Sequence, residues 1–181
     1  MHVSNFREVK RVPEVISVFH EVLKNDIKAK LLLVGDGPDR QRAERRCREL
    51  KICDQVRFLG KQENVEEILS IADLFLIPSG SETFGLAALE AMSCSVPVIS
   101  TNIGGLPEVN VHGETGYLCD LDDIECMAKH AVDILQDEEH HEELSRNARK
   151  QAERFEMSKI VTRYEDYYKK VKSELMKQSV S

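Results

Sequence analysis

Two carboxylates lie around the start of a predicted helix in the middle of the chain. Glu82 stands in a polar loop, and Glu90 follows eight residues later, inside the helical pattern of residues 85–93. A carboxylate accepts hydrogen bonds from two vicinal hydroxyls, so each of these groups could bind one sugar ring of a single ligand. The alternative is that Glu82 caps the helix while Glu90 faces solvent.

Backbone amides at the start of this helix could hold a diphosphate. Phe84, Gly85 and Leu86 form the entry to the helix, directly after Thr83. The first amides of a helix lack intrahelical acceptors, and the helix dipole adds about 0.3–1 kcal/mol of attraction for an anion. The sequence therefore predicts an anion-binding helix N-terminus here.

Three cations follow the first predicted strand. Arg7, Lys10 and Arg11 lie within five residues after the strand at residues 2–6. A guanidinium or ammonium group can neutralise a phosphate at such a position, and Lys10 or Arg7 is the candidate. The alternative is an ordinary solvated basic turn.

Two pairs of glycines follow other predicted strands. Gly35 and Gly37 come after one strand, and Gly104 and Gly105 come after another. Gly104 and Gly105 can approach a ligand closely, whereas at Gly35 and Gly37 glycine permits either a close approach of the backbone to a ligand or a tight turn alone. The first pair is not the dinucleotide fingerprint G-x-G-x-x-G, because Arg40 occupies the position of its third glycine.

Several familiar catalytic and metal-binding patterns are missing from the sequence. The six histidines are scattered, the five cysteines form no C-x-x-C pair, and no H-E-x-x-H, G-x-S-x-G or P-loop pattern occurs. We therefore expect no metal, no serine-hydrolase site, and reduced thiols in a cytoplasmic protein rather than disulfides. Asp120, Asp122 and Asp123 are interpreted as helix caps rather than cation ligands.

The elements that must position these residues alternate along the chain. Predicted strands cover residues 2–6, 30–34, 56–59, 74–78, 96–100 and 116–119, and helical patterns begin at Val12 and cover residues 39–51, 65–71, 85–93 and 124–136. Several strands are continuously apolar, which is typical of parallel strands with helices on both faces. We predict an α/β fold with a doubly wound, mostly parallel six-stranded sheet. Two charged helices, at 137–155 and 158–176, either cover this sheet or reach toward another domain.

Length and charge exclude several other classes of protein. The 181 residues predict one domain, and the net charge of −7 argues against nonspecific binding of nucleic acid. No apolar run approaches the ~18 residues that a membrane-spanning helix needs. We expect neither a nucleic-acid partner nor a membrane span.

Several motifs in a fixed order give the sequence a recognisable family resemblance. Glu82 and Glu90, together with Phe84-Gly85-Leu86, are similar to the donor-binding C-terminal domain of retaining GT-B glycosyltransferases of family 4. The likeness continues through Gly35-Asp36-Gly37-Pro38, Phe58-Leu59-Gly60, Pro97-Val98-Ile99, Gly104-Gly105-Leu106-Pro107-Glu108 and His112-Gly113-Glu114-Thr115-Gly116. It spans residues 2 to about 155 and implies a Rossmann-like domain, the C-terminal half of a GT-B fold, followed by C-terminal helices.

The resemblance implies which residues hold the donor. Glu90 binds the ribose hydroxyls of UDP in this interpretation, and Glu82 binds a hydroxyl of the donor sugar. Thr83, Phe84, Gly85 and Leu86 hold the diphosphate and the sugar through their backbone, and Gly35 also contacts the donor.

The resemblance also implies how the departing phosphate is stabilised. Lys10 neutralises its charge, with Arg7 as the second cation. Many relatives carry an arginine at the position of Asn5, which leaves Asn5 as a donor contact and makes Arg7 the substitute. A clamp of this kind replaces a divalent metal, so none is expected.

Within the family, residues 3–11 are most similar to members that transfer N-acetylglucosamine (GlcNAc) from UDP-GlcNAc to L-malate, the first step of bacillithiol biosynthesis. In GT-B enzymes the acceptor binds an N-terminal domain, which this chain does not contain. We therefore expect residues 1–155 to be the donor-binding half and residues 156–181 to be a helix that packs toward the missing domain. The chain alone is expected to bind UDP weakly and to transfer sugar poorly or not at all.

Other functions remain open at this point. A UDP-sugar epimerase of GT-B architecture would need acidic and histidine catalysts near Glu82, and the sequence shows no such set. A non-catalytic module that binds nucleotide sugars is the other alternative. Assembly into a homo-oligomer is left open.

Overall fold

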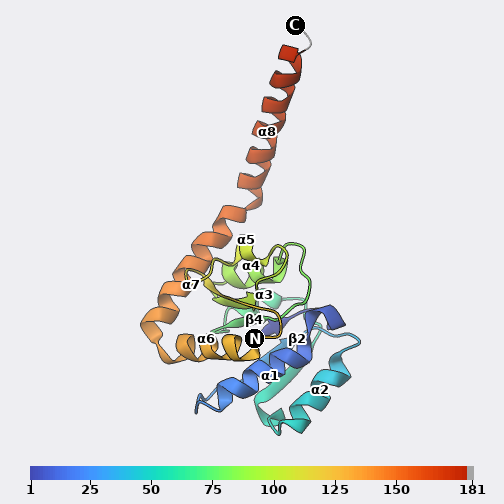
Figure 1. Cartoon of the computed structure of the whole chain (residues 1–181), viewed down its shortest axis with the longest axis vertical. Coiled ribbons are helices and arrows are strands. Elements are labelled where there is room, and N and C mark those ends of the chain that lie inside the picture. Colours follow the sequence, from blue (N-terminus) through green and yellow to red (C-terminus); the bar gives the residue numbers. More distant parts are fainter. Residues whose placement is uncertain (179–181) are drawn as a thin grey trace.

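The computed structural model describes residues 1–178, apart from the side chains of residues 157, 158, 160, 162, 163 and 173–178. Strands and helices alternate through this part of the chain (Figure 1). The strands are β1 (His2–Val3), β2 (Leu31–Val34), β3 (Val56–Gly60), β4 (Phe75–Ile77), β5 (Val98–Thr101) and β6 (Gly116–Cys119). The α-helices are α1 (Val12–Leu23), α2 (Arg40–Glu49), α3 (Val65–Leu69), α4 (Leu86–Ser93), α5 (Leu106–Val109), α6 (Ile124–Gln136), α7 (Glu138–Ala152) and α8 (Met157–Gln178), and the 3₁₀ turns are η1 (Glu8–Lys10), η2 (Cys53–Gln55) and η3 (Glu153–Phe155).

All strand pairs are parallel, as predicted. They form two three-stranded sheets with the orders β1-β2-β3 and β4-β5-β6. β1 and β4 are neighbours, because the Leu76 amide donates to the Met1 carbonyl at 2.9 Å and the Met1 amine donates to the Leu74 carbonyl at 2.7 Å. The spatial order is therefore β3-β2-β1-β4-β5-β6, which is the doubly wound arrangement. The predicted fold class is confirmed, but the sheet divides in two because β1 has only two residues.

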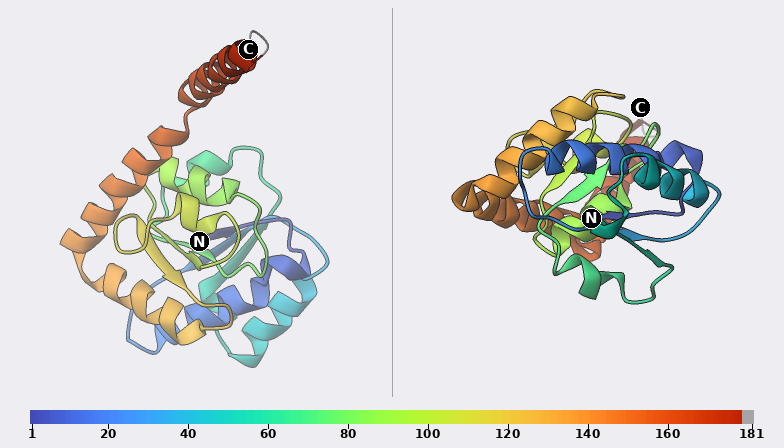
Figure 2. Two further views of the ribbon diagram at one scale, coloured as in Figure 1. Left: turned by 45° about the horizontal axis from the view of Figure 1, so that its top comes forward. Right: turned by 90° about the horizontal axis from the view of Figure 1, so that it is seen from below.

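Helices cover both faces of the strands (Figures 1 and 2). α1, α2 and α6 pack over one face around buried residues such as Ile16, Leu33 and Ile134. α3, α4, α5 and α7 cover the other face around residues such as Phe75 and Met92. Burial on both faces explains why the strands read as continuous apolar runs.

The first strand is shorter than predicted and ends in a constrained turn. β1 stops at Val3 rather than at residue 6, and Phe6 is fully buried with a positive φ of 42°. The buried His2 ring fixes this turn: its Nδ1 donates to the Leu76 carbonyl at 2.8 Å, and its Nε2 accepts from the Ser4 hydroxyl at 2.8 Å. The Ser4 oxygen in turn accepts from the Phe6 amide.

Two disulfides correct the expectation of reduced thiols. Cys47 at the end of α2 is bonded to Cys53 in η2, and Cys119 at the end of β6 is bonded to Cys126 in α6. In each case the chain turns back after an element ends, so residues six or seven apart in sequence meet. Cys94 is the free thiol.

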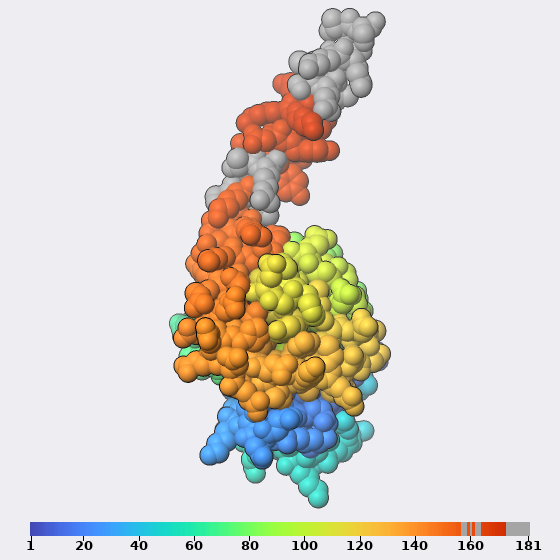
Figure 3. All heavy atoms as spheres, turned by 60° about the vertical axis from the view of Figure 1, so that its left-hand side comes forward, coloured from blue at the N-terminus to red at the C-terminus, as the bar shows by residue number. Residues whose placement is uncertain are grey.

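The last helix extends away from the rest of the molecule. Figures 1 and 3 show α8 continuing beyond the layers that contain the sheets. Tyr164, Tyr167 and Tyr168 are 61–69% exposed, and Val161 is exposed as well. α8 therefore reaches outward, one of the two arrangements predicted for it, and α7 is the helix that covers the sheet.

Among residues 1–178, no helix combines the length and apolar character that crossing a bilayer requires.

Candidate functional site

The carboxyl ends of the parallel strands bring the predicted site loops to one edge. The loop after β1 (residues 4–11) and the loop after β4 (residues 78–85) are joined directly, since the Gly80 amide donates to the Val9 carbonyl at 2.8 Å. Ligands of open parallel sheets bind at this edge, beside the point where the strand order reverses. That point lies between β1 and β4 in this fold.

Lys10 and Glu82, both predicted to be catalytic, contact each other at this edge. The Lys10 Nζ donates to the Glu82 Oε2 at 2.5 Å, and the two side chains are 24% and 17% exposed. The pair links the loop after β1 to the loop after β4. An ammonium group has three N–H donors, so Lys10 can retain Glu82 while it also binds a phosphate oxygen.

The remaining cations of the basic turn have different surroundings. Arg7 is exposed and forms no ion pair with the described residues, so its guanidinium is open to a ligand. Arg11 is occupied, because it forms ion pairs with Asp122 and, at 3.6 Å, with Glu14. Asn5 is exposed in the same loop. The turn therefore offers Lys10 and Arg7 to an anion and uses Arg11 to hold the fold.

The aspartates after β6 only partly follow the prediction. Asp123 caps α6, since its carboxylate accepts from the Cys126 amide at 2.8 Å. Asp122 instead binds Arg11, so its interpretation as a helix cap is wrong. Asp120 is exposed, and its side chain caps no helix within the described residues.

The start of α4 presents unpaired backbone amides, as predicted. Gly85 precedes the helix with a φ of 95°, a conformation that glycine adopts without strain. In the described chain, Thr83, Phe84 and Gly85 donate no backbone hydrogen bond. Leu86 is the first helical residue, so its amide has no intrahelical acceptor. These amides can bind an anion, and the identity of that anion stays a prediction.

Gly104 and Gly105 support this loop. The Gly105 amide donates to the Glu82 carbonyl at 3.0 Å. A Cβ at Gly104 would overlap the Glu82 carbonyl oxygen, and a Cβ at Gly105 would overlap the Thr83 carbonyl oxygen. The bare backbone after β5 thus sets the position of Glu82 and of the free amides. Gly104 and Gly105 thus lie close to the backbone of residues 82–84.

Gly35 supports the other loop in the same way. Its amide donates to the Gly60 carbonyl at 2.8 Å, and a Cβ added to it would overlap the Ser4 carbonyl oxygen. A Cβ at Gly37 would overlap the carbonyl oxygen of Asn5. Both glycines thus approach the backbone of the loop after β1 closely. Contact of Gly35 with a donor stays a prediction.

Glu90 lies on the exposed side of α4. Its carboxylate forms no ion pair or side-chain hydrogen bond with the described residues, so both oxygens are available to hydroxyl groups. Partial burial raises the pKa of Glu90 above its ordinary value, and the negative charge of Glu66 on α3 raises it further. Glu90 is the free carboxylate of the predicted pair, whereas Glu82 is held by Lys10.

Sequence reasoning missed two groups near these elements. The Phe155 ring packs edge-to-face against the Phe84 ring, with 5.7 Å between centroids, so the segment after α7 supports the loop before α4. An aromatic residue at the end of a highly charged helix was the available signal. The side chains of Cys119, Cys126 and His130 also lie together where β6 meets α6, and these three could hold a metal ion.

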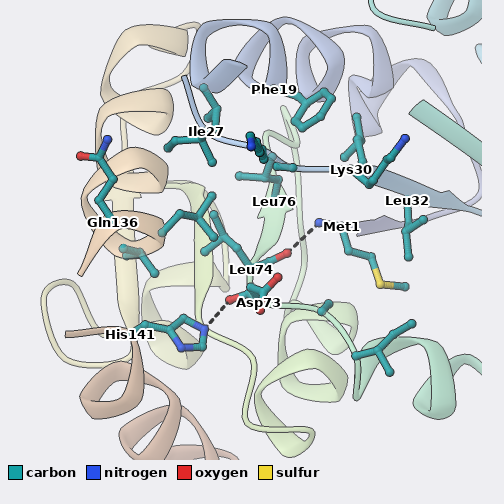
Figure 4. A pocket seen from close by; sticks show the side chains of 18 of the residues that line it. Met1, Phe19, Ile27, Lys30, Leu32, Asp73, Leu74, Leu76, Gln136 and His141 are labelled. Atoms are coloured by element: carbon teal, nitrogen blue, oxygen red, sulfur yellow. Dashed lines mark hydrogen bonds between the residues drawn. The ribbon is translucent and has the colours of Figure 1, made fainter. Parts of the chain in front are cut away.

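A hollow of about 810 Å³ lies at the opposite edge (Figure 4). Met1, Phe19, Lys30, Leu74 and His141 line it, around the points where β1, β2 and β4 begin. His141 Nε2 donates there to the Asp73 carbonyl at 2.8 Å. None of the predicted site residues lines it. Because ligands of doubly wound sheets bind at the carboxyl edge, this hollow is not the candidate site.

Comparison with known proteins supports the fold and the motifs. Residues 1–151 match the family described as Glycosyl transferases group 1. A relative, N-acetyl-alpha-D-glucosaminyl L-malate synthase of Bacillus anthracis, is 48% identical over 169 residues, which are 93% of this chain and 44% of that enzyme. The chain thus spans less than half the length of this relative.

Solved structures show the same fold. TarM of S. aureus, in a complex with UDP and alpha-GlcNAc-glycerol, has a TM-score of 0.85 at 23% identity over 91% of this chain and 34% of TarM. HepE of Anabaena, in a complex with UDP, has a TM-score of 0.83 at 23% identity over 95% of this chain and 48% of HepE. On the match over residues 1–151, the chain belongs to the group 1 glycosyl transferase family.

Proposed function

We propose that this chain is the donor-binding domain of a retaining glycosyltransferase. It binds UDP-GlcNAc at the carboxyl edge of β1 and β4, and the intact enzyme transfers GlcNAc to a small acceptor, L-malate. One observation carries this proposal: the Lys10–Glu82 ion pair lies in two directly joined loops, one of which runs into the free amides at the start of α4.

The cations act on the leaving group. When the sugar–phosphate bond breaks, negative charge develops on the terminal phosphate of UDP. Lys10 is already fixed by Glu82 before a ligand arrives, so little reorganisation is needed at the moment of reaction. Arg7 supplies a second positive charge from the same loop. This clamp lets the transfer proceed without a divalent metal.

The carboxylates and amides orient the donor. Amides of residues 83–86 bind the diphosphate at the N-terminus of α4. Glu90 accepts hydrogen bonds from the two ribose hydroxyls with its free carboxylate. Glu82 binds a hydroxyl of the donor sugar with the oxygen that Lys10 does not use.

Relatives support the choice of donor and acceptor. The B. anthracis relative is named for GlcNAc and L-malate, and both solved structures contain UDP. The chain covers 44% of that relative, so we assign the acceptor site to sequence outside this chain. The exposed tyrosines of α8 fit a helix that packs on such a domain. We place the protein in the cytoplasm, where its disulfides would be reduced.

The proposal is tested by calorimetric titration with UDP, UDP-GlcNAc, UDP-glucose, ADP-glucose and NAD. We expect binding of UDP and UDP-GlcNAc, weaker binding of ADP-glucose, and no binding of NAD. The oxidised chain, with both disulfides formed, should bind UDP equally well with and without the metal chelator EDTA, because the proposed clamp uses no metal. Binding of NAD in preference to every uridine nucleotide would overturn the proposal.

A further inference from the structure

Three metal-ligand side chains gather where β6 meets α6. Cys119 is the last residue of β6, whereas Cys126 and His130 lie one turn apart on α6. Residues four apart on a helix share a face, so both side chains can turn toward the strand end. The ligand atoms of all three residues lie within 4.8 Å of one another. In the disulfide form the two sulfurs are bonded to each other, with the imidazole beside them.

This ligand set is one that zinc prefers. Zinc binds thiolates at ~2.3 Å and imidazole nitrogen at ~2.0 Å in tetrahedral geometry. An ion at these distances keeps its ligand atoms ~3.3–3.8 Å apart. In the disulfide form the two sulfurs are closer than this because they are bonded, and the imidazole nitrogen lies within 4.8 Å of both. Binding of an ion therefore requires that the S–S bond be broken and the two sulfurs move apart.

His130 is held in place and has a nitrogen to offer. Its ring stacks on the Tyr117 ring with centroids 3.8 Å apart and planes 5° apart. Among the described residues it makes ring contacts but no hydrogen bond. A ring nitrogen of His130 is therefore available as a ligand.

The disulfide between Cys47 and Cys53 resembles the one between Cys119 and Cys126, but it has no third metal-ligand side chain beside it in the described chain. Cys47 and Cys119 are each buried to 3% exposure, and Cys53 and Cys126 are each half-buried. The two bridges span six and seven residues, with Cα–Cα distances of 5.2 and 6.0 Å. Within the described chain, only the pair at β6 and α6 has a histidine in reach. A disulfide alone therefore does not make the cluster. The histidine on α6 distinguishes Cys119–Cys126 from the other bridge.

We propose that, after reduction of the disulfide, Cys119, Cys126 and His130 bind Zn²⁺. A dithiol reductant supplies two electrons and two protons, the S–S bond breaks, two thiols form, and the reductant becomes its own disulfide. Binding of the metal then releases both thiol protons to solvent, and water takes the fourth position. Three protein ligands make this an exchangeable site. It does not depend on the proposed transferase activity.

The position of the site indicates what the metal does. The disulfide and the metal both tie Cys119 to Cys126 and so restrain residues 120–125. Asp122 in that segment forms the ion pair with Arg11, next to Lys10. The metal-bound form therefore restrains the same loop that the disulfide restrains. The disulfide form and the metal-bound form thus both restrain the loop that carries Asp122, the partner of Arg11.

The test is a titration of the full chain with Co²⁺, which absorbs strongly when thiolates bind it. The protein is reduced with dithiothreitol, which is then removed anaerobically. In the Cys47→Ser/Cys53→Ser variant we expect one equivalent of Co²⁺, a thiolate-to-cobalt charge-transfer band, the visible spectrum of a tetrahedral site, and displacement by Zn²⁺. The Cys119→Ser/Cys126→Ser variant keeps the other dithiol and should bind at least ~100-fold more weakly, without that band.

A third variant isolates the imidazole. His130→Phe keeps a ring to stack on Tyr117 but removes the nitrogen, and it should weaken Co²⁺ binding at least ~10-fold and change the visible spectrum. Circular dichroism of each variant checks that the fold is retained. The proposal is overturned if the reduced Cys47→Ser/Cys53→Ser variant shows no thiolate–cobalt band. It is also overturned if the two double variants bind Co²⁺ equally well. The same holds if His130→Phe, made in the Cys47→Ser/Cys53→Ser variant, binds Co²⁺ as tightly as that variant does.

Discussion

Substitution of Gly104 by alanine should damage the donor site without touching a ligand. Gly104 has a φ of 57°, and its added Cβ would overlap the Glu82 carbonyl oxygen. An alanine in this left-handed conformation costs about 1–2 kcal/mol. Relief of the overlap moves the loop at residues 82–84 and costs about 1–3 kcal/mol more. The free energy of unfolding should therefore fall by about 2–5 kcal/mol.

Gly113→Ala is the matched control for this prediction. Gly113 also has a positive φ, 77°, but nothing lies within 4 Å of its added Cβ. It should lose only the conformational cost of about 1–2 kcal/mol. Urea unfolding measures both losses, and calorimetry measures the dissociation constant for UDP. We expect about tenfold weaker UDP binding for Gly104→Ala, because the amides and Glu82 move out of register, and less than twofold for Gly113→Ala. Equal losses of stability with unchanged UDP binding in both variants would refute the supporting role of Gly104.

Three further predictions follow from other contacts. Glu66→Gln removes a negative charge that raises the pKa of Glu90, so the pH at which UDP binding is lost on acidification should move downward. Calorimetric titrations from pH 4 to 7 measure this pH, and an unchanged value would contradict the prediction. Burial lowers the pKa of His2 from 6.5 to about 4, so on acidification the unfolded chain takes up a proton at this residue before the folded chain does. The contribution of neutral His2 to the free energy of unfolding is therefore fully present above pH 6.5, and it falls by about 3 kcal/mol as the pH drops to 4. His2→Gln should remove this slope from urea unfolding curves, and an unchanged slope would assign it to other groups. Deletion of residues 157–181 should leave the urea midpoint close to that of the full chain, because Val161 and the three tyrosines of α8 are exposed; a large decrease would instead place α8 in the core.

Most of the architecture could be predicted from local patterns. Continuous apolar runs located the strands to within a few residues, because each strand is buried on both faces. Parallel strands end at one edge, so the loops that follow β1 and β4 could be assigned to one site. The early end of β1 could not be predicted. It depends on the buried His2 ring and on the left-handed Phe6, which only the packing against β4 explains.

Contacts between distant residues were not readable from the sequence. Lys10 and Glu82 are 72 residues apart, and their pairing depends on how the loops after β1 and β4 pack together. The Arg11–Asp122 pair spans 111 residues and removed Asp122 from the predicted helix caps. The disulfides were missed because composition and the missing C-x-x-C spacing were the only guides. The turn after each element, which brings the sulfurs together, is a property of the fold.

We propose that Lys10 and Glu90 bind different parts of one nucleoside diphosphate, Lys10 the phosphate and Glu90 the ribose. This is tested most directly by titration of UDP and uridine into the wild-type chain, Lys10→Met and Glu90→Gln. We predict that Lys10→Met weakens binding of UDP but leaves binding of uridine unchanged, whereas Glu90→Gln weakens binding of both. If Lys10→Met binds UDP like the wild type, or if Glu90→Gln binds uridine like the wild type, the account of the site is contradicted.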